Sequence, residues 1–461
     1  MQSLKKKIFN TIIAVVMLLP LGVTAQTLTS SINTYSPYSM YGLGELATPG
    51  TVMQRSMGGV GVAMFSSTSV NMMNPAAFAN TPRQSFLFNF ELDGGHFQNE
   101  QSKFLETGTS KVKTAYNTLN IHNISFQMPL AGGVGLGFSL SPYSNVGYSI
   151  YRDDMSLIGQ SGRWGFEYTG EGDVTEVKLG VGWAPTKKFS FGASAIYYWG
   201  SINRTYKGIS KNIIVGSGEY ASTMGIDTYD VSRIKAQVGV MWNPILKTDK
   251  ILSFGATYDL GGSLMPDMVK SVYVDNLLDS EVRVETDAAL PLRLPKQVAA
   301  GVFFQNLKFR VGADYVYQAW GGDNSSIVEN STNGDNGVQV AYTDTHTVKV
   351  GFQYVPRHTD VRSYLRRVAY RVGARYGDYY QTYGGEKIQQ LAVTAGFGFP
   401  VQLFGRSSID VGVEYGMRGL GDKTIMVDNK TVGLVSQQYV KLSIGLSLFG
   451  EDEWFMMRKY K

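Results

Sequence analysis

The chain of 461 residues contains no cysteine, only four histidines and 17% charged residues. The absence of cysteine excludes a disulfide framework, thiolate metal sites, cysteine catalysis and a lipid-modified N-terminal cysteine. The histidines, His96, His122, His346 and His358, are far apart and form no His-Glu-x-x-His zinc motif. No Gly-x-Ser-x-Gly nucleophile elbow stands between a strand and a helix. We therefore expect no enzyme, no cofactor and no metal, and we expect His122 to be a hydrogen-bonded residue of the fold.

Long apolar runs are also scarce, and the only prominent one lies at the N-terminus. Three lysines, Lys5 to Lys7, precede the apolar stretch Ile8 to Val23, and small residues follow up to Ala25. This order predicts a secretory signal peptide over residues 1–25, because a membrane anchor would need ~20 apolar residues and no cleavage site. Removing it lowers the net charge from +5 to +2. So small a charge gives no indication of nucleic-acid binding.

Glycine and aromatic residues are abundant instead, with 53 Gly, 28 Tyr, 23 Phe and 6 Trp. From Gln84 onward, segments of about ten residues alternate apolar with polar or small side chains, as Val440 to Leu448 do. Membrane-crossing strands need ~9–11 residues, whereas strands of globular proteins average ~5–6. Trp and Tyr residues gather near the ends of these segments, as in the aromatic girdles of membrane barrels. The pattern therefore predicts strands that cross a membrane.

Fourteen such strands are expected. Their approximate ranges are 84–92, 119–129, 133–148, 173–183, 189–202, 232–242, 251–259, 296–305, 308–320, 343–354, 367–376, 388–398, 408–418 and 437–448. Long and short connections alternate along this series, as long external loops and short periplasmic turns do in outer-membrane barrels. We therefore predict an all-β protein, a transmembrane antiparallel β-barrel of about fourteen strands, integral to the bacterial outer membrane.

The segment before the first strand does not alternate. Residues 26–83 are rich in glycine and small residues but also hold Met53, Met57, Met64 and other apolar side chains, which are too many for a disordered linker. A barrel of this width has a lumen that must be filled. We expect a plug inside the lumen, and a flexible periplasmic tail is the alternative. The predicted division is 1–25 signal peptide, 26–83 plug, 84–449 barrel and 450–461 periplasmic tail.

Several short motifs in this layout resemble the long-chain fatty acid transporter (FadL) family, also called the outer membrane protein transport family. They are Asn74-Pro75-Ala76 in the plug, Leu294-Pro295, Asp314 and Trp320, Ser36-Pro37-Tyr38-Ser39 with Tyr41-Gly42, and Trp454-Phe455 to Arg458-Lys459. The resemblance implies uptake of hydrophobic molecules, a plug that rearranges and a lateral opening in the third strand. That strand carries Pro142-Tyr143-Ser144-Asn145, and a proline breaks strand pairing for a physical reason, since it has no N–H to donate. The alternative is that Pro142 only marks the start of an external loop.

Charged residues alternate with the apolar face on several predicted strands, so we expect them to line the lumen. They are Arg233, Lys235, Arg310, Asp314, Arg371, Arg375, Asp410, Glu414 and Arg418. They suit either a binding site or ion pairs that tie the plug to the wall. The predicted loop 93–118 is polar, and no apolar external helical hairpin of the FadL kind is present.

Two functional classes follow from these observations. The first is passive uptake of hydrophobic, fatty-acid-like small molecules, with membrane lipid as the destination. The second is a non-transporting accessory or scaffold barrel of an outer-membrane assembly or secretion complex. Its partners would be envelope proteins bound by the external loops and by the acidic, aromatic and basic tail 450–461. A continuous apolar path beside strand three favours the first class, and a sealed lumen with paired charges favours the second.

Overall fold

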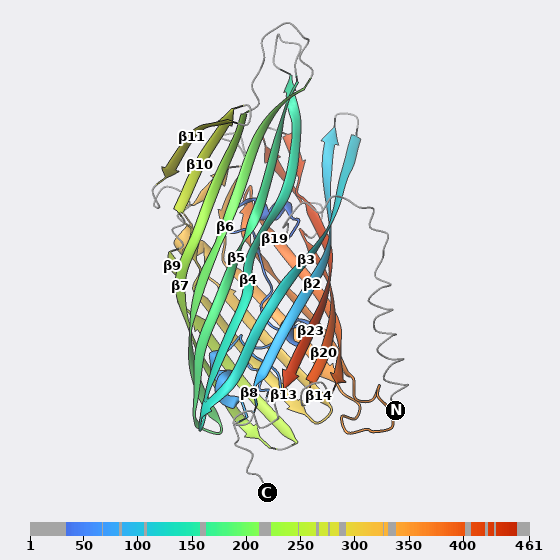
Figure 1. Cartoon of the computed structure of the whole chain (residues 1–461). Helices are drawn as coiled ribbons and strands as arrows, with labels where there is room; N and C mark the ends of the chain where they lie inside the picture. Colours follow the sequence, from blue (N-terminus) through green and yellow to red (C-terminus); the bar gives the residue numbers. More distant parts are fainter. Residues whose placement is uncertain are drawn as a thin grey trace.

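Long strands dominate the computed structural model of the chain, drawn in Figure 1. The structure describes residues 34–66, 68–82, 85–105, 108–156, 163–211, 223–247, 249–263, 267–274, 277–284, 292–325, 327–330, 338–401, 407–419, 423–427 and 430–449. The predicted signal peptide and the predicted tail 450–461 lie outside these residues. Among the described residues, no helix is long and apolar enough to cross a membrane.

Fourteen antiparallel strands form a closed barrel, which confirms the predicted fold class and strand number. They are β2 (Leu87–Leu105), β3 (Gly108–Ala131), β4 (Val134–Ser156), β5 (Arg163–Thr186), β6 (Phe189–Lys211), β7 (Thr223–Leu246), β8 (Lys250–Asp259), β13 (Gln297–Asn306), β14 (Phe309–Gln318), β17 (Thr345–Tyr354), β18 (Ala369–Tyr383), β19 (Glu386–Val401), β20 (Ser407–Arg418) and β23 (Ser436–Phe449). Each strand pairs with the next, and β23 closes the ring on β2.

The two faces of the wall are those of a membrane barrel. In β7, Ile234 and Val238 are exposed on the outer face, whereas Lys235 and Gln237 are buried on the inner face. A soluble sheet would place these side chains the other way round, because its polar face would meet water. An apolar exterior over a fully paired sheet suits lipid, so the protein is integral to the outer membrane, as predicted.

The strands β2 to β7 are much longer than predicted. Residues 93–105, 108–118, 149–156, 163–172, 203–211 and 223–231 lie in strands, so the expectation that 93–118, 149–172 and 203–231 are loops was wrong. The inner faces of these parts still bury apolar side chains such as Phe97, Tyr229 and Val231, but polar residues such as His96 and Gln98 take outer positions. The outer face therefore lacks the apolar row that marks a lipid-facing strand, although the backbone pairing continues.

Smaller elements decorate the outer end of the barrel (Figure 1). They are β9 (Gly262–Ser263), β10 (Asp267–Val274), β11 (Leu277–Val284), β12 (Arg293–Leu294), α4 (Trp320–Asn324), β15 (Val328–Asn330), β16 (Gln339–Tyr342), β21 (Thr424–Val427) and β22 (Lys430–Gly433). Of these, β10 extends the sheet beside the outer half of β7, and β11 pairs with β10.

The N-terminal segment lies inside the barrel in short elements: η1 (Pro37–Met40), β1 (Glu45–Leu46), α2 (Val52–Arg55) and η2 (Pro75–Asn80). Local sequence dictates the helical turns. Thr51 and Gln54 form a reciprocal capping box at the start of α2. Asn74 caps η2 through the N–H of Ala76, with Pro75 at the first position, where no N–H is needed. We refer to residues 34–48 as the bridging segment and to residues 50–82 as the core segment.

A belt of glycines lets the core segment lie directly on the wall. A Cβ atom built on Gly373 would stand 2.1 Å from the backbone nitrogen of Gly58, and one on Gly351 would stand 2.2 Å from the Met57 carbonyl. Every barrel strand from β4 to β23 contributes such a position. The glycine belt comprises Gly135, Gly137, Gly180, Gly182, Gly192, Gly239, Gly255, Gly301, Gly312, Gly351, Gly373, Gly396, Gly412 and Gly445. Backbone atoms of the core segment are the nearest neighbours at Gly135, Gly182, Gly192, Gly255, Gly351 and Gly373, and side-chain atoms are nearest at the other positions. In both cases a side chain on the glycine would have no room, so the belt accounts for part of the high glycine content.

Candidate functional site

The barrel wall has a gap between β3 and β4. Their pairing runs from Ala131 and Val134 at the periplasmic rim up to Ile124 and Leu140, and no further pairs join them among the described residues. Beyond this point β3 pairs with β2 alone, and β4 pairs with β5. The two hairpins therefore separate in the outer half of the barrel (Figure 1).

The bridging segment fills this gap from inside. Its strand β1 pairs antiparallel with β4, with Leu46 opposite Ser144. The N–H of Ala47 donates to the carbonyl of Tyr143 at 2.8 Å. On the other side of the gap, Tyr35 stacks on Tyr116 of β3 with ring centroids 4.8 Å apart. The luminal chain thus replaces the missing wall strand over a short distance.

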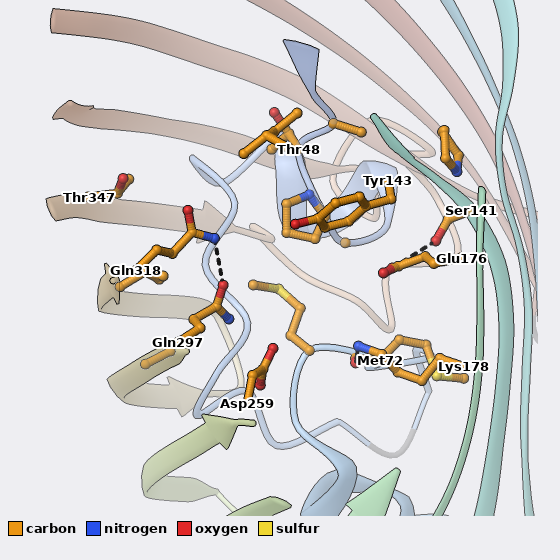
Figure 2. Close-up of a pocket in the computed structure, with 18 of the residues that line it drawn as sticks. Thr48, Met72, Ser141, Tyr143, Glu176, Lys178, Asp259, Gln297, Gln318 and Thr347 are labelled. Carbon is orange, nitrogen blue, oxygen red and sulfur yellow. Dashed lines mark hydrogen bonds between the residues drawn. The ribbon is translucent and has the colours of Figure 1, made fainter. Parts of the chain in front are cut away.

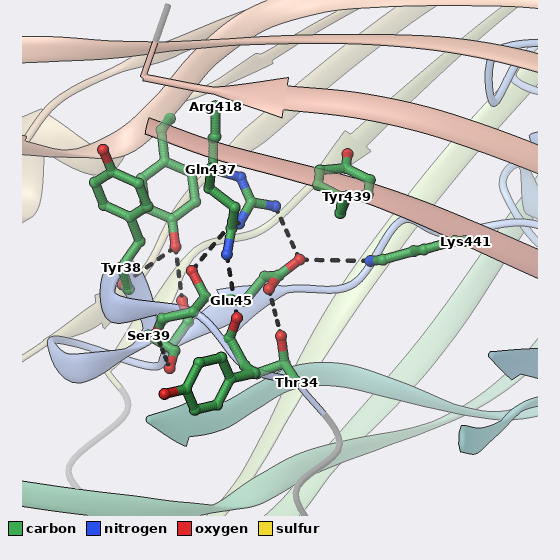
Figure 3. Close-up of polar contacts among 12 residues, drawn as sticks. Thr34, Tyr38, Ser39, Glu45, Arg418, Gln437, Tyr439 and Lys441 are labelled. Carbon is green, nitrogen blue, oxygen red and sulfur yellow. Dashed lines mark hydrogen bonds and ion pairs between the residues drawn. The ribbon is translucent and has the colours of Figure 1, made fainter. Parts of the chain in front are cut away.

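A buried charge network anchors the bridging segment (Figure 3). The carboxylate of Glu45 accepts hydrogen bonds from Arg418 at 2.8 Å and from Thr34 at 2.5 Å, and Lys441 lies 3.4 Å away. Burial alone would raise the pKa of Glu45, but Arg418 and Lys441 together hold this pKa below its usual range. The Glu45 carboxylate is therefore ionised at neutral pH.

The low pKa of Glu45 predicts how this anchor responds to acid. Because the folded-state pKa lies below the unfolded value of ~4.3, the stabilising contribution is complete above about pH 5 and is lost as pH falls through the folded-state pKa. We expect the difference in thermal unfolding temperature between the wild type and Glu45→Gln to stay constant from pH 8 to pH 6. It should shrink only below about pH 4. A difference that already disappears near pH 6 would contradict this.

A chamber of about 210 Å³ lies behind the gap (Figure 2). Its lining residues come from the bridging segment, from the core segment and from most of the wall, and they include Thr48, Met72, Pro142, Tyr143, Lys178, Tyr198, Lys235, Asp259, Gln297, Gln318 and Lys349. Tyr143 packs edge-on against Tyr198 at 4.7 Å. The volume is below the ~300–1,000 Å³ of sites for drug-sized ligands, so the chamber suits a small molecule.

The floor of the chamber is the core segment, which a second buried charge cluster fixes to the wall. Arg55 donates to both carboxylate oxygens of Asp93, at 2.5 and 2.9 Å, and lies 3.4 Å from Glu91. Asp93 also contacts the ring of His122 at 3.0 Å. These contacts hold the core segment to β2 and β3, the two strands that lack belt glycines. The floor is therefore attached around the whole circumference.

An aromatic layer roofs the lumen at the outer end. Trp320 is fully buried against Tyr380, with ring centroids 4.6 Å apart, so it does not belong to the lipid-facing girdle as the sequence suggested. Arg204 bridges this layer to the bridging segment, donating to the Gly42 carbonyl at 2.8 Å and pairing with Glu329 at 3.3 Å. Within the described residues, the core segment, the bridging segment and the aromatic layer thus each cross part of the lumen.

The structure places the nine predicted lumen residues on the inner face of the wall. Several of them form ion pairs: Arg371 with Asp410 at 2.5 Å, Arg375 with Glu414 at 2.5 Å, Arg418 with Glu45 at 2.8 Å, and Lys235 with Asp259 at 3.4 Å. Asp314 accepts the N–H groups of Gly61 and Val62. Arg233 and Arg310 are half-buried on the same face. The structure therefore brings these residues together as anchors and lining, and their functional role stays a prediction.

The predicted plug motif packs on the wall outside the chamber lining, whereas the predicted opening motif contributes to that lining. Asn74 donates to the carbonyl oxygens of Val62 and Val240, and Pro75 and Ala76 lie against the belt glycine Gly192. The other motif begins two residues beyond the last β3–β4 pair. In it Pro142 and Tyr143 line the chamber, and Ser144 and Asn145 pair with β1.

Sequence reasoning missed several residues of the site. Glu45 and Arg55 lie in a segment without periodicity, so nothing marked them as ion-pair partners. Asp93 fell in a predicted loop, although it continues the inward series of Asn89 and Glu91 along β2. In the described part of the chain, no cluster of His, Asp and Glu is arranged to hold a metal ion.

Comparisons with known proteins agree with this architecture. A family model described as BamG matches residues 5–461. No curated protein matches the chain.

Solved structures share the fold at low sequence identity. A Pseudomonas aeruginosa FadL homologue aligns with a TM-score of 0.56 and 12% identity, over 88% of this chain and 99% of that one. The Pseudomonas putida toluene transporter TodX aligns with a TM-score of 0.52 and 17% identity, over 89% and 100%. The CymD monoaromatic hydrocarbon channel aligns with a TM-score of 0.51 and 14% identity, over 88% and 98%. The predicted FadL-like character is confirmed at the level of the fold, and the chain belongs to the BamG family.

Proposed function

We propose that this barrel passes small hydrophobic or amphiphilic molecules from its lumen into the membrane through the gap between β3 and β4. The observation that carries the proposal is that a luminal segment, not a wall strand, pairs with β4 at Ser144 and Asn145. Two residues of pairing are far easier to release than a full barrel seam. Release would connect the chamber with the lipid phase.

The immobile floor refines the proposed mechanism. The glycine belt and the Arg55 cluster fasten the core segment to the wall, so movement is confined to the bridging segment. A fixed floor closes the periplasmic side while the gap opens sideways. This version of the plug rearrangement needs no loss of core packing, in which Met57 and Met64 are fully buried.

The chamber indicates a ligand class. Lys178 donates to the Met72 carbonyl at 3.1 Å, and Lys235 and Lys349 also face the chamber beside Tyr143 and Tyr198. Lys235 is paired with Asp259, and Glu176 also lines the chamber, so charges of both signs stand beside aromatic rings and suit a small amphiphile. The similar solved structures are named as a toluene transporter and a monoaromatic hydrocarbon channel, which supports small apolar cargo in barrels of this fold.

The test is a disulfide lock in a chain that has no native cysteine. Leu46 and Ser144 are direct partners, so Leu46→Cys/Ser144→Cys should form a disulfide that ties β1 to β4. In cells, we expect the oxidised lock to lower uptake of radiolabelled octanoate, a small amphiphile, at least fivefold, and reduction to restore it. The matched control is Ser408→Cys/Ser447→Cys, a pair within the permanent β20–β23 seam. Undiminished uptake by the fully oxidised lock would refute the proposal.

A second candidate is a non-transporting subunit of an outer-membrane complex. The observation that favours it is that most of the predicted luminal charges are held in ion pairs and so tie the luminal segments and the wall together. Under this alternative, the locked protein would keep full cellular function. It would also retain a stoichiometric envelope protein through purification in mild detergent.

A further inference from the structure

The connection between β17 and β18 differs from the other periplasmic turns. Residues 355–368 form an ordered loop of mainly basic character, with Arg357, Arg362, Arg366 and Arg367 against the single carboxylate of Asp360. That carboxylate already has hydrogen-bonding and ion-pair partners within the loop. It accepts the N–H groups of Arg362 and Ser363 at 2.9 and 3.0 Å and pairs with Arg366 at 3.2 Å. The loop therefore presents excess positive charge at the periplasmic rim.

Several large apolar side chains beside these arginines are exposed to solvent. Val361 is 87% exposed and Leu365 is 66% exposed, and Leu307 in the adjacent β13–β14 turn is 58% exposed. The N–H of Val355 donates to the carbonyl of Lys308, so turn and loop form one surface. We refer to Leu307, Lys308 and residues 355–368 as the basic rim patch.

The basic rim patch is tied to the lipid-facing aromatic girdle. Tyr370 donates its hydroxyl to the carbonyl of Leu365 at 3.1 Å and packs edge-on against Phe397 of the outer face. Tyr364 donates to the carbonyl of Pro400, also at 3.1 Å, and Arg367 lies over its ring. Aromatic girdles mark the level of the lipid headgroups. The arginines next to this girdle therefore lie where lipid phosphates are found.

An apolar groove rises from the same strands on the outer wall. It has a volume of about 580 Å³. It is lined by Val302, Phe304, Val311, Gly312, Ala313, Val350, Gly351, Phe352, Val372, Gly373 and Ala374 of β13, β14, β17 and β18. Ala313 and Ala374 leave it open because larger outward side chains flank them. The groove occupies the periplasmic half of these strands, directly above the basic rim patch.

We propose that the groove and the basic rim patch together form a binding site for an anionic phospholipid of the periplasmic leaflet. An acyl chain lies in the groove, and the phosphate meets Arg357, Arg362 and Lys308 below the girdle. Val361 and Leu365 enter the interfacial region, as apolar residues of interfacial segments do. The groove and the basic rim patch are independent observations, because an apolar groove does not require nearby charge and a basic loop does not require a groove. Their alignment on four neighbouring strands is what one lipid molecule requires.

The test compares two lipids with identical chains. Protein purified in mild detergent and washed free of lipid is titrated with dioleoylphosphatidylglycerol or dioleoylphosphatidylcholine, and bound molecules are counted by native mass spectrometry. We expect at least a fivefold preference for the anionic lipid. Arg357→Gln/Arg362→Gln should abolish the preference, whereas Lys187→Gln/Lys188→Gln, on a turn with no groove above it, should keep it.

A second variant tests the groove without touching charge. Ala374→Phe should weaken binding of both lipids at least fivefold. Retention of the faster migration of the unheated protein in gels, which heating converts to the slower migration of the unfolded chain, would verify that each variant is folded. Equal binding of the two lipids by the wild type, or unchanged binding by both site variants, would overturn the proposal. So would loss from the arginine variant of a co-purifying periplasmic protein with lipid binding unaltered, since the patch would then be a protein-docking surface.

Discussion

Gly373→Val is expected to lower the free energy of unfolding by about 3 kcal/mol or more, because two pieces of backbone occupy the space the side chain needs. Its Cβ would stand 2.1 Å from the nitrogen of Gly58 and 2.2 Å from the carbonyl carbon of Met57. If the neighbouring atoms belonged to a flexible side chain, that side chain could move aside. They belong instead to the backbone of the core segment at Met57 and Gly58. Either the core segment leaves the wall or β18 distorts.

The measurement is urea unfolding of the barrel in lipid vesicles, combined with protease protection of the N-terminal segment. Gly225→Val is the matched control, since its Cβ would meet nothing closer than Tyr206 at 3.9 Å. Valine is favoured in strands, so this control should change stability by less than about 1 kcal/mol. Wild-type stability and protection in Gly373→Val would show that the core segment does not rest on the glycine belt.

Arg55→Met is expected to destabilise the protein by about 3–5 kcal/mol, the range for removing one partner of a buried ion pair. The methionine fits the space, but Asp93 and Glu91 lose the cation that neutralises them. The same change at an exposed pair should matter little. Lys423→Met removes a pair with Glu386 at 3.4 Å in solvent, and we expect a loss below about 1 kcal/mol.

A double variant separates charge from packing. Arg55→Met/Asp93→Leu replaces both ions by apolar groups, and such replacements are often nearly neutral. We therefore expect the double variant to be more stable than Arg55→Met alone in the same urea titration. If the loss in the double variant equalled the sum of the losses in Arg55→Met and Asp93→Leu, the two residues would act independently, which contradicts the geometry.

The fold was predictable because its signal is repeated along the chain. Each membrane-crossing strand places apolar side chains toward lipid and polar or small side chains toward the lumen. Strands such as Val440–Leu448 can therefore be recognised in the sequence by this alternation. The outer faces of the extensions of β2 to β7 carry polar residues such as His96 and Gln98, so their sequence lacks the apolar lipid-facing row. Strand number and localisation could be predicted for this reason, while strand length could not.

The site was only partly predictable, because pairing partners far apart in sequence leave no local trace. Arg418 and Glu414 were recognisable as inward residues, but the partner of Arg418 is Glu45, 373 positions away. Glycines of the belt look like any other small residue in a strand. Pro142 carried a usable signal, since a residue without an N–H marks weak pairing, and the structure ends the β3–β4 ladder beside it.

The glycine belt also constrains the order in which the chain can fold. The core segment touches every strand from β4 to β23, yet it precedes all of them in sequence. A finished barrel with such close backbone contacts offers no path for threading this segment in afterwards. We therefore expect the segment to be in place before β23 pairs with β2 along the seam that joins the two ends of the sheet. On this view the strands assemble around the N-terminal core segment, which they contact from β4 to β23.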